Sequence, residues 1–162
     1  MSTDRIEVTN IKVRAEQVTI MGLETNGAHK ARVSLVDCPD KPSARFKEAL
    51  AAVQEDVLKM TGIKGDGFVK AFSLYGVGVD TDKHGHHGFT FMVSLTTAWG
   101  TAHLALPRLR ERVDDESGVG VLSDVTQKRV GTLLAAAADY YAQDREQQVL
   151  PLDGAASASG GE

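Results

Sequence analysis

The chain has 162 residues, of which 42% are apolar and 25% charged, a composition typical of one globular domain with a single core. Its net charge of −4 opposes a broadly basic, nucleic-acid-binding surface, although a local basic patch is compatible with it. A single cysteine, Cys38, excludes a disulfide framework and favours a reducing, intracellular compartment. The N-terminus has no apolar signal segment, and no run approaches the roughly 20 apolar residues that span a bilayer, so we expect neither secretion by that route nor a membrane span.

Residues 6–13 predict a first strand, with Ile6 and Val8 on one face and Ile11 and Val13 on the other. Because both faces then carry apolar side chains, we expect both to be partly covered.

A second strand is predicted over residues 18–23, followed by the Asn26-Gly27 pair that hairpin turns favour. Its partner, residues 31–36, alternates apolar and polar side chains as expected of a half-buried antiparallel strand.

Pro39 and Pro42 end this sheet segment, and residues 43–61 then predict an amphipathic helix. Asp40 or Ser43 can cap its start, and Gly62 is suited to its end. The apolar stripe comprises Phe46, Ala49, Leu50, Val53, Val57 and Met60.

Residues 68–79 and 88–99 form the clearest strand pair, because aromatic and branched side chains alternate along both. Gly76 and Gly78 indicate a bulge or a curved sheet. A short strand over residues 103–106 ends at Pro107, residues 108–120 read as a loop, and a second helix is expected from Ser123 to about Asp144.

These elements predict an α+β fold in which an antiparallel sheet of about four to six strands carries two helices on one face. We expect one domain over residues 1–152 and a flexible Gly/Ser/Ala tail over residues 153–162. One sheet segment precedes each helix, which makes a duplication conceivable.

The chain resembles a group of small, uncharacterised proteins of tailed bacteriophages. The shared features are the opening Ile-x-Val-Thr-Asn-Ile, the Asp-Lys-Pro-Ser entry to the first helix, the hairpin from Phe68 to Trp99, the Leu-Ala-Leu-Pro segment ending at Pro107, and a last helix ending in an aromatic pair. The resemblance implies a phage protein in the cytoplasm of an infected bacterial cell, carried in some genomes with replication and recombination genes. It implies no known activity.

The segment from Gln147 to Leu152 looks like the bacterial sliding-clamp-binding motif Gln-x-x-Leu-x-(Leu/Phe), with Gln147, Leu150 and Leu152 at its key positions. In such motifs two apolar side chains fill adjacent pockets while the glutamine amide sets the orientation, and Pro151 favours the extended form. Related phage proteins end in Gln-x-x-Leu-Phe, from which this chain departs. The alternative is that Leu150 and Leu152 pack on the protein's own sheet.

A basic cluster of Arg108, Arg110 and Arg112, with Lys128 and Arg129 further along the chain and Trp99 nearby in the sequence, suggests a second binding mode. Together with Phe89 and Phe91 it could form a groove in which bases stack and phosphates contact arginines. The alternative is a solvated loop in which Glu111 and the carboxylates of residues 114–116 neutralise the arginines, and the overall acidity favours that alternative.

Three histidines, His84, His86 and His87, lie in one Gly-rich turn, where we expect a solvated hairpin tip and not a metal site. The Gly-rich segments 62–67 and 76–78 do not match a phosphate-binding loop. Neither Cys38 nor any serine lies in a pattern typical of a nucleophile. We therefore expect a non-enzyme without a cofactor.

The leading hypothesis is an accessory protein of DNA replication or recombination whose C-terminal peptide binds a bacterial or phage sliding clamp. A single-stranded-DNA-binding module and an inhibitor of a host defence system are the alternatives.

Overall fold

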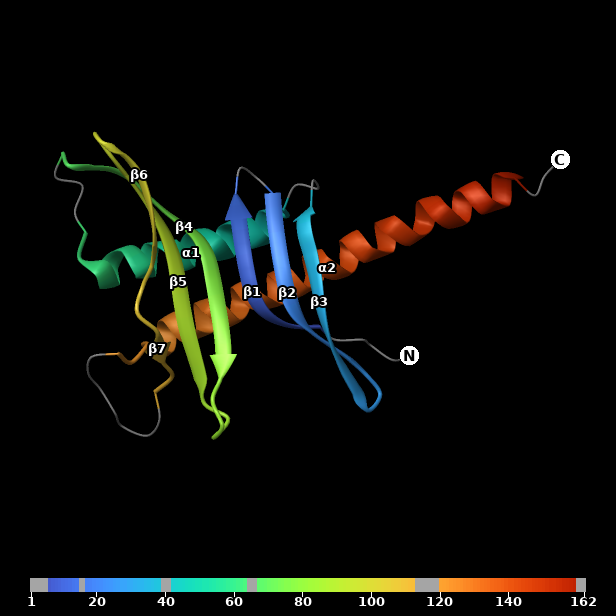
Figure 1. Ribbon diagram of the computed structural model, residues 1–162, viewed down its shortest axis with the longest axis horizontal. Helices are drawn as coiled ribbons and strands as arrows, with labels where there is room; N and C mark the ends of the chain where they lie inside the picture. Colours follow the sequence, from blue (N-terminus) through green and yellow to red (C-terminus); the bar gives the residue numbers. More distant parts are fainter. Residues whose placement is uncertain (1–5, 15–16, 39–41, 64–66, 113–119, 160–162) are drawn as a thin grey trace.

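The computed structural model describes residues 6–14, 17–38, 42–63, 67–112 and 120–159, and within these ranges all side chains except those of residues 26, 36–38 and 144–159. An antiparallel sheet forms one layer, and two helices form a second layer on one of its faces (Figure 1). The predicted α+β class is therefore confirmed.

The elements follow one another as β1 (Ile6–Arg14), β2 (Gln17–Asn26), β3 (His29–Cys38), α1 (Ala44–Thr61), β4 (Val69–Thr81), β5 (His87–Thr97), β6 (Gly100–Ala105), β7 (Leu109–Arg110) and α2 (Asp124–Ser159). The strand order is β3-β2-β1-β4-β5-β6, and the two-residue β7 pairs with β5 beyond the end of β6. Part of the segment expected to be a loop, residues 108–120, thus adds a short strand to the sheet.

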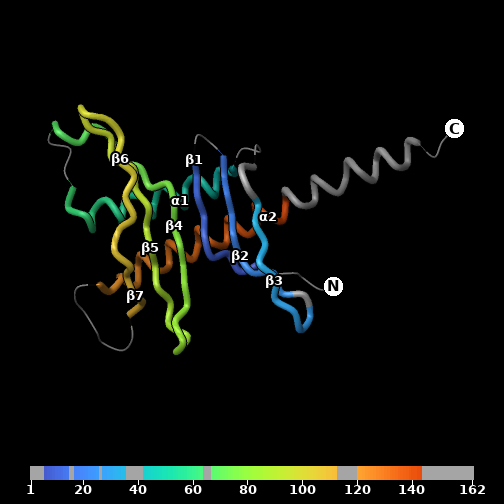
Figure 2. Tube along the Cα trace, viewed as in Figure 1, coloured from blue at the N-terminus to red at the C-terminus, as the bar shows by residue number. Residues whose placement is uncertain are grey.

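The chain consists of two successive units, each with strands followed by one helix: β1 to β3 with α1, and β4 to β7 with α2 (Figure 2). Their first strands, β1 and β4, pair with each other at the centre of the sheet. Helix α1 contacts β4 and helix α2 contacts β1, so the helix of each unit packs on the first strand of the other. The two units therefore share one core.

A β-bulge in β1 decides which side chains face the helices. The register between β1 and β2 shifts between Val8 and Asn10, so that Val8 and Ile11 both point into the core, although they are three residues apart. The expectation that both faces of the first strand are covered is wrong, because the bulge brings the two predicted apolar faces onto one side.

The hairpin between β2 and β3 turns one residue later than the Asn-Gly pair suggested. Asn26 pairs with His29 as the last strand residue, and the two-residue loop is Gly27-Ala28. Gly27 has φ of 60°, a left-handed conformation that glycine adopts without steric cost.

Helix α1 has the ends that its sequence predicts. The Ser43 hydroxyl accepts a hydrogen bond from the Phe46 N–H at 3.2 Å, and Gly62 ends the helix with φ of 65°. Phe46, Ala49, Val53 and Val57 of the predicted stripe are buried, whereas Met60 at the last turn is exposed.

Helix α2 begins where expected, after Ser123, whose hydroxyl accepts a hydrogen bond from the Thr126 N–H. Its end at Ser159 lies well beyond the predicted end near Asp144. Residues 145–148 are Arg-Glu-Gln-Gln, all good helix formers, so the helical preference continues past the last aromatic pair.

One buried carboxylate ties the two helices together. Asp56 of α1 accepts hydrogen bonds from the Thr126 hydroxyl, at 3.1 Å, and from the Arg129 guanidinium, both on α2. Since Thr126 is also held by the Ser123 cap, this network joins the start of α2 to the middle of α1.

Replacing Asp56 by alanine should destabilise the fold, because it leaves the buried Thr126 hydroxyl and the half-buried Arg129 without their acceptor. We expect the free energy of unfolding in urea to fall by about 1–3 kcal/mol. Glu55→Ala is the matched control: the neighbouring carboxylate of Glu55 forms an exposed pair with Lys59, so its loss should leave the free energy of unfolding close to that of wild type. Equal losses in the two variants would contradict a structural role for Asp56.

Candidate functional site: the open face of the sheet

The sheet face that carries no helix, here called the open face, holds the candidate site. Strand residues that alternate with the buried ones, such as Lys12 beside Ile11 and Thr19 beside Val18 and Ile20, lie on it. The described residues form hollows there, one of them of about 150 Å³ and lined by Lys12, Arg14, Gln17 and Thr19.

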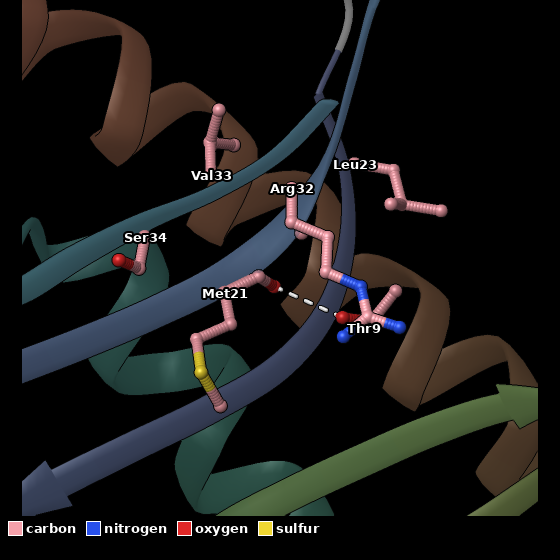
Figure 3. Close-up of a pocket in the computed structure, with 7 residues that line it drawn as sticks. Thr9, Met21, Leu23, Arg32, Val33 and Ser34 are labelled. Atoms are coloured by element: carbon pink, nitrogen blue, oxygen red, sulfur yellow. Dashed lines mark hydrogen bonds between the residues drawn. The ribbon is translucent and has the colours of Figure 1, made fainter. Parts of the chain in front are cut away.

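The larger hollow, of about 460 Å³, lies over β1, β2 and β3. Its lining residues include Thr9, Met21, Leu23, Arg32 and Ser34. Figure 3 shows the Arg32 side chain extending from β3 toward Thr9. The Thr9 hydroxyl donates a hydrogen bond to the Met21 carbonyl at 3.3 Å, which links β1 to β2 at the base of the hollow. The hollow thus combines apolar walls with one guanidinium.

Tyr75 is the central aromatic residue of the open face. The Arg14 guanidinium lies 5.7 Å from its ring centroid, and the His103 ring meets it edge-on at 5.3 Å. The Ser94 hydroxyl, on the strand between Tyr75 and His103, lies 2.8 Å from His103 Nδ1. Side chains of four strands, β1, β4, β5 and β6, therefore form one continuous row across the sheet.

A second bulge places Tyr75 in this row. The register between β4 and β5 shifts between Leu74 and Gly76, which leaves Tyr75 as the extra residue. Bulges interrupt the ladder of backbone hydrogen bonds, and here the Gln54 side chain of α1 accepts from the Leu74 N–H at 3.1 Å. The bulge that sequence analysis expected near Gly76 is therefore present, and a helix side chain supports it.

Charge on the open face differs in sign from the chain as a whole. Lys12 and Arg14 of β1 and Arg32 of β3 lie on it, together with the exposed Glu7 of β1, which is level with Leu23 and Arg32. The carboxylate of Asp80, at the end of β4, is already engaged by Arg108. Many of the described carboxylates lie on the helices instead, namely Glu48, Glu55, Asp56, Asp124 and Asp139. The same helices carry as many cations, namely Arg45, Lys47, Lys59, Lys128 and Arg129, so the described helix layer is balanced in charge and the net charge of −4 conceals an excess of cations on the open face.

The structure does not bring together the predicted cluster of Trp99, Arg108, Arg110 and Arg112. Trp99 lies in the turn after β5, while Arg108, Arg110 and Arg112 lie in and around β7, which pairs with the beginning of β5. Phe89 and Phe91, which were expected to take part, are buried under the helices. Trp99, 91% exposed, instead meets Phe68 edge-on at 6.1 Å.

Arg108 serves a structural role. Its guanidinium crosses β5 over Gly88 and binds the carboxylate of Asp80 with hydrogen bonds of 2.5 to 3.0 Å. A Cβ at position 88 would collide with the guanidinium, so a side chain there would displace Arg108 from this position. Arg112 lies 3.8 Å from Asp124, which likewise directs it toward the protein's own carboxylates.

The three histidines lie at an exposed hairpin tip. The Asp82 carboxylate shapes the tip by accepting hydrogen bonds from the backbone N–H groups of His86 and His84, at 2.9 and 2.8 Å. The hydrogen bond from His86 is the main cause that lowers the pKa of Asp82. His87 Nδ1 lies 3.2 Å from the Thr81 hydroxyl. Among the described residues, no group of three His, Cys, Asp or Glu side chains is arranged to hold a metal ion.

Gln147, Leu150 and Leu152 lie within the bounds of α2, but their side chains are outside the described residues. The backbone of this segment is helical and not extended, so clamp binding in the extended form would require this end of the helix to unwind. Docking of this peptide on a sliding clamp stays a prediction.

The chain was also compared with known proteins: no protein-family model, curated protein or solved structure matches it. Over the part of the chain that the structure describes, no helix is both long and apolar enough to cross a bilayer.

The pair formed by Asp80 and Arg108 should make stability depend on pH. The hydrogen bond from Arg108 lowers the pKa of Asp80, so the pair stabilises the fold above the unfolded-state pKa of about 3.9 and loses this effect as the pH falls through the lower, folded-state pKa. Because both side chains are substantially exposed, Asp80→Asn should cost only about 0.2–1 kcal/mol at neutral pH.

Urea unfolding of wild type and Asp80→Asn at a series of pH values measures this difference, which should shrink toward zero in acid. Glu48→Gln, an exposed change on α1, is the control and should leave stability within about 0.5 kcal/mol of wild type. A difference that grows as the pH falls would contradict the assignment.

Proposed function

We propose that the open face binds single-stranded DNA. The observation that carries this proposal is the row in which Tyr75 lies between Arg14 and His103, on a face that also presents Lys12 and Arg32. Proteins that bind single strands combine cations that contact phosphates with aromatic rings on which bases stack. Both components are present here on one side of one sheet.

The components lie on a diagonal across the sheet. Arg32 on β3 is level with Glu7 of β1, whereas Gly76, next to Tyr75, is level with Lys12. The three steps between neighbouring strands from β3 to β4 amount to about 14 Å, and the five residues along β1 add an offset of roughly 17 Å in the strand direction. Lys12 and Arg14 lie between them on β1. A bound strand would therefore contact cations on β3 and β1 before it reaches the rings of Tyr75 and His103.

Unpaired bases are the ligands that this surface favours. An aromatic ring on a sheet can stack only on a base whose face is free, which a duplex does not offer. The hydroxyl groups of Thr19 and Ser94 and the apolar side chain of Met21 add contacts that do not select one base. We infer single-strand binding with little sequence preference.

Single-strand binding would suit the role in DNA replication or recombination that the resemblance to phage proteins implies, and in it the protein would act by binding and not by catalysis. This wider role is part of the proposal and rests on that resemblance, not on the geometry of the open face.

Removing the Tyr75 ring should weaken binding of a fluorescein-labelled oligothymidylate, measured by fluorescence anisotropy at low ionic strength. A stacked base contributes about 1–3 kcal/mol, so the dissociation constant of Tyr75→Ala should rise about 5- to 150-fold, while Tyr75→Phe should bind nearly as wild type. Lys47→Gln, an exposed change on the helix layer, is the control for charge alone.

The variant Arg14→Gln tests the electrostatic contribution to the affinity for single-stranded DNA. One lost phosphate contact should reduce the slope of log affinity against log salt concentration by about 0.7 for a single strand. Absence of binding at low ionic strength, or an equal loss in Lys47→Gln and Arg14→Gln, would refute binding at the open face.

A further inference from the structure

Strand β6 forms one edge of the sheet, and all six of its side chains are exposed. Within the described parts of the chain its only strand partner is β5. Figure 1 shows β6 at the side of the sheet opposite β3. One row of its backbone hydrogen-bonding groups therefore faces away from the sheet.

The hydrogen bonds identify which residues of β6 face outward. The Leu106 N–H donates to the Phe91 carbonyl at 2.8 Å, and in an antiparallel ladder every second residue bonds to the same neighbour. Leu104 and Ala102 therefore direct their N–H and C=O groups to β5. The outward groups belong to Thr101, His103 and Ala105.

The two edges of the sheet differ in how they resist pairing. Exposed edge strands usually carry charged residues or proline, which prevent association with other strands. Strand β3 has Lys30 and Arg32, whereas β6, with the sequence Gly-Thr-Ala-His-Leu-Ala, has no Lys, Arg, Asp, Glu or Pro. Leu104 of β6 is 43% exposed, and Trp99, just before the strand, is also exposed.

We propose that β6 pairs antiparallel with β6 of a second copy of this chain. A two-fold axis at His103 places Thr101 of one copy opposite Ala105 of the other and His103 opposite His103. The outward N–H and C=O groups of all three residues then form hydrogen bonds with the other copy. A single symmetric contact uses the β6 edge of each copy and leaves neither β6 edge open. Because β6 has no Lys, Arg, Asp or Glu, no like-charged pair of these side chains would face each other across the two pairing strands.

This dimer does not depend on DNA binding, but it would extend the open face. His103 belongs to the row that contains Tyr75 and Arg14, so the axis would place the rows of two copies end to end on one continuous sheet. The pairing strands are short, so the interface is small and the dimer should form only at high protein concentration.

Sedimentation equilibrium without DNA tests the dimer. For wild type the average mass should rise toward twice that of the monomer as concentration increases. Ala105→Pro removes an outward N–H without touching the ladder to β5, and Ala105→Lys introduces a charge at the edge. Two lost hydrogen bonds per dimer should raise the dissociation constant of Ala105→Pro about 5- to 150-fold.

Ala31→Lys, the same change on the opposite edge strand, is the matched control and should dimerise as wild type. Circular dichroism spectra that match wild type establish that each variant is folded. A wild type that stays monomeric at all concentrations, or an Ala105→Pro protein that dimerises as wild type does, would overturn the proposal.

Cross-linking tests the register. In the Cys38→Ser background, the proposed axis places Ala102 of one copy opposite Leu104 of the other, at the close, non-hydrogen-bonded type of position. A mixture of Ala102→Cys and Leu104→Cys proteins should therefore form disulfide-linked dimers under mild oxidation, and far fewer should form when either protein is oxidised alone. Equal cross-linking in all three samples would overturn this register.

Discussion

Coverage of the sheet on one side only is the constraint on which the rest of the structure depends. All core side chains of the strands must point toward α1 and α2, since those helices supply the other half of the core. Bulges at Val8–Asn10 and Leu74–Gly76 make this possible in the two central strands. The same shifts leave Lys12, Arg14 and Tyr75 on the opposite, open face.

Core packing and the candidate site are thus two results of one arrangement. The bulge that contains Tyr75 is stabilised from the helix side, where Gln54 accepts the Leu74 N–H. Helix α1 is in turn joined to α2 through Asp56 and Arg129. A polar network in the helix layer therefore supports the geometry of an aromatic side chain on the other side of the sheet.

Distribution of charge matters more for this protein than its net charge. The net charge of −4 argued against binding of nucleic acid. Cations nevertheless lie on the open face, while many of the described carboxylates lie on the helices or pair with arginine. Two arginines of the cluster predicted from the sequence, Arg108 and Arg112, lie near the protein's own carboxylates. Those that carry the proposed function, Arg14 and Arg32, come from separate strands.

The sequence by itself determined the fold class, the span of α1 with its Ser43 and Gly62 ends, and the positions of the main strands, because periodicity and capping depend on neighbours within a few residues. Only the tertiary structure decided which strand faces are covered, where Tyr75 points and that Trp99 and Arg108 lie at opposite ends of β5. Pairing of β1 with β4 joins residues more than sixty positions apart, and the bulge in β1 reverses the alternation from which the faces had been predicted. Long-range pairing of this kind leaves no local pattern, and it alone assembles the open face.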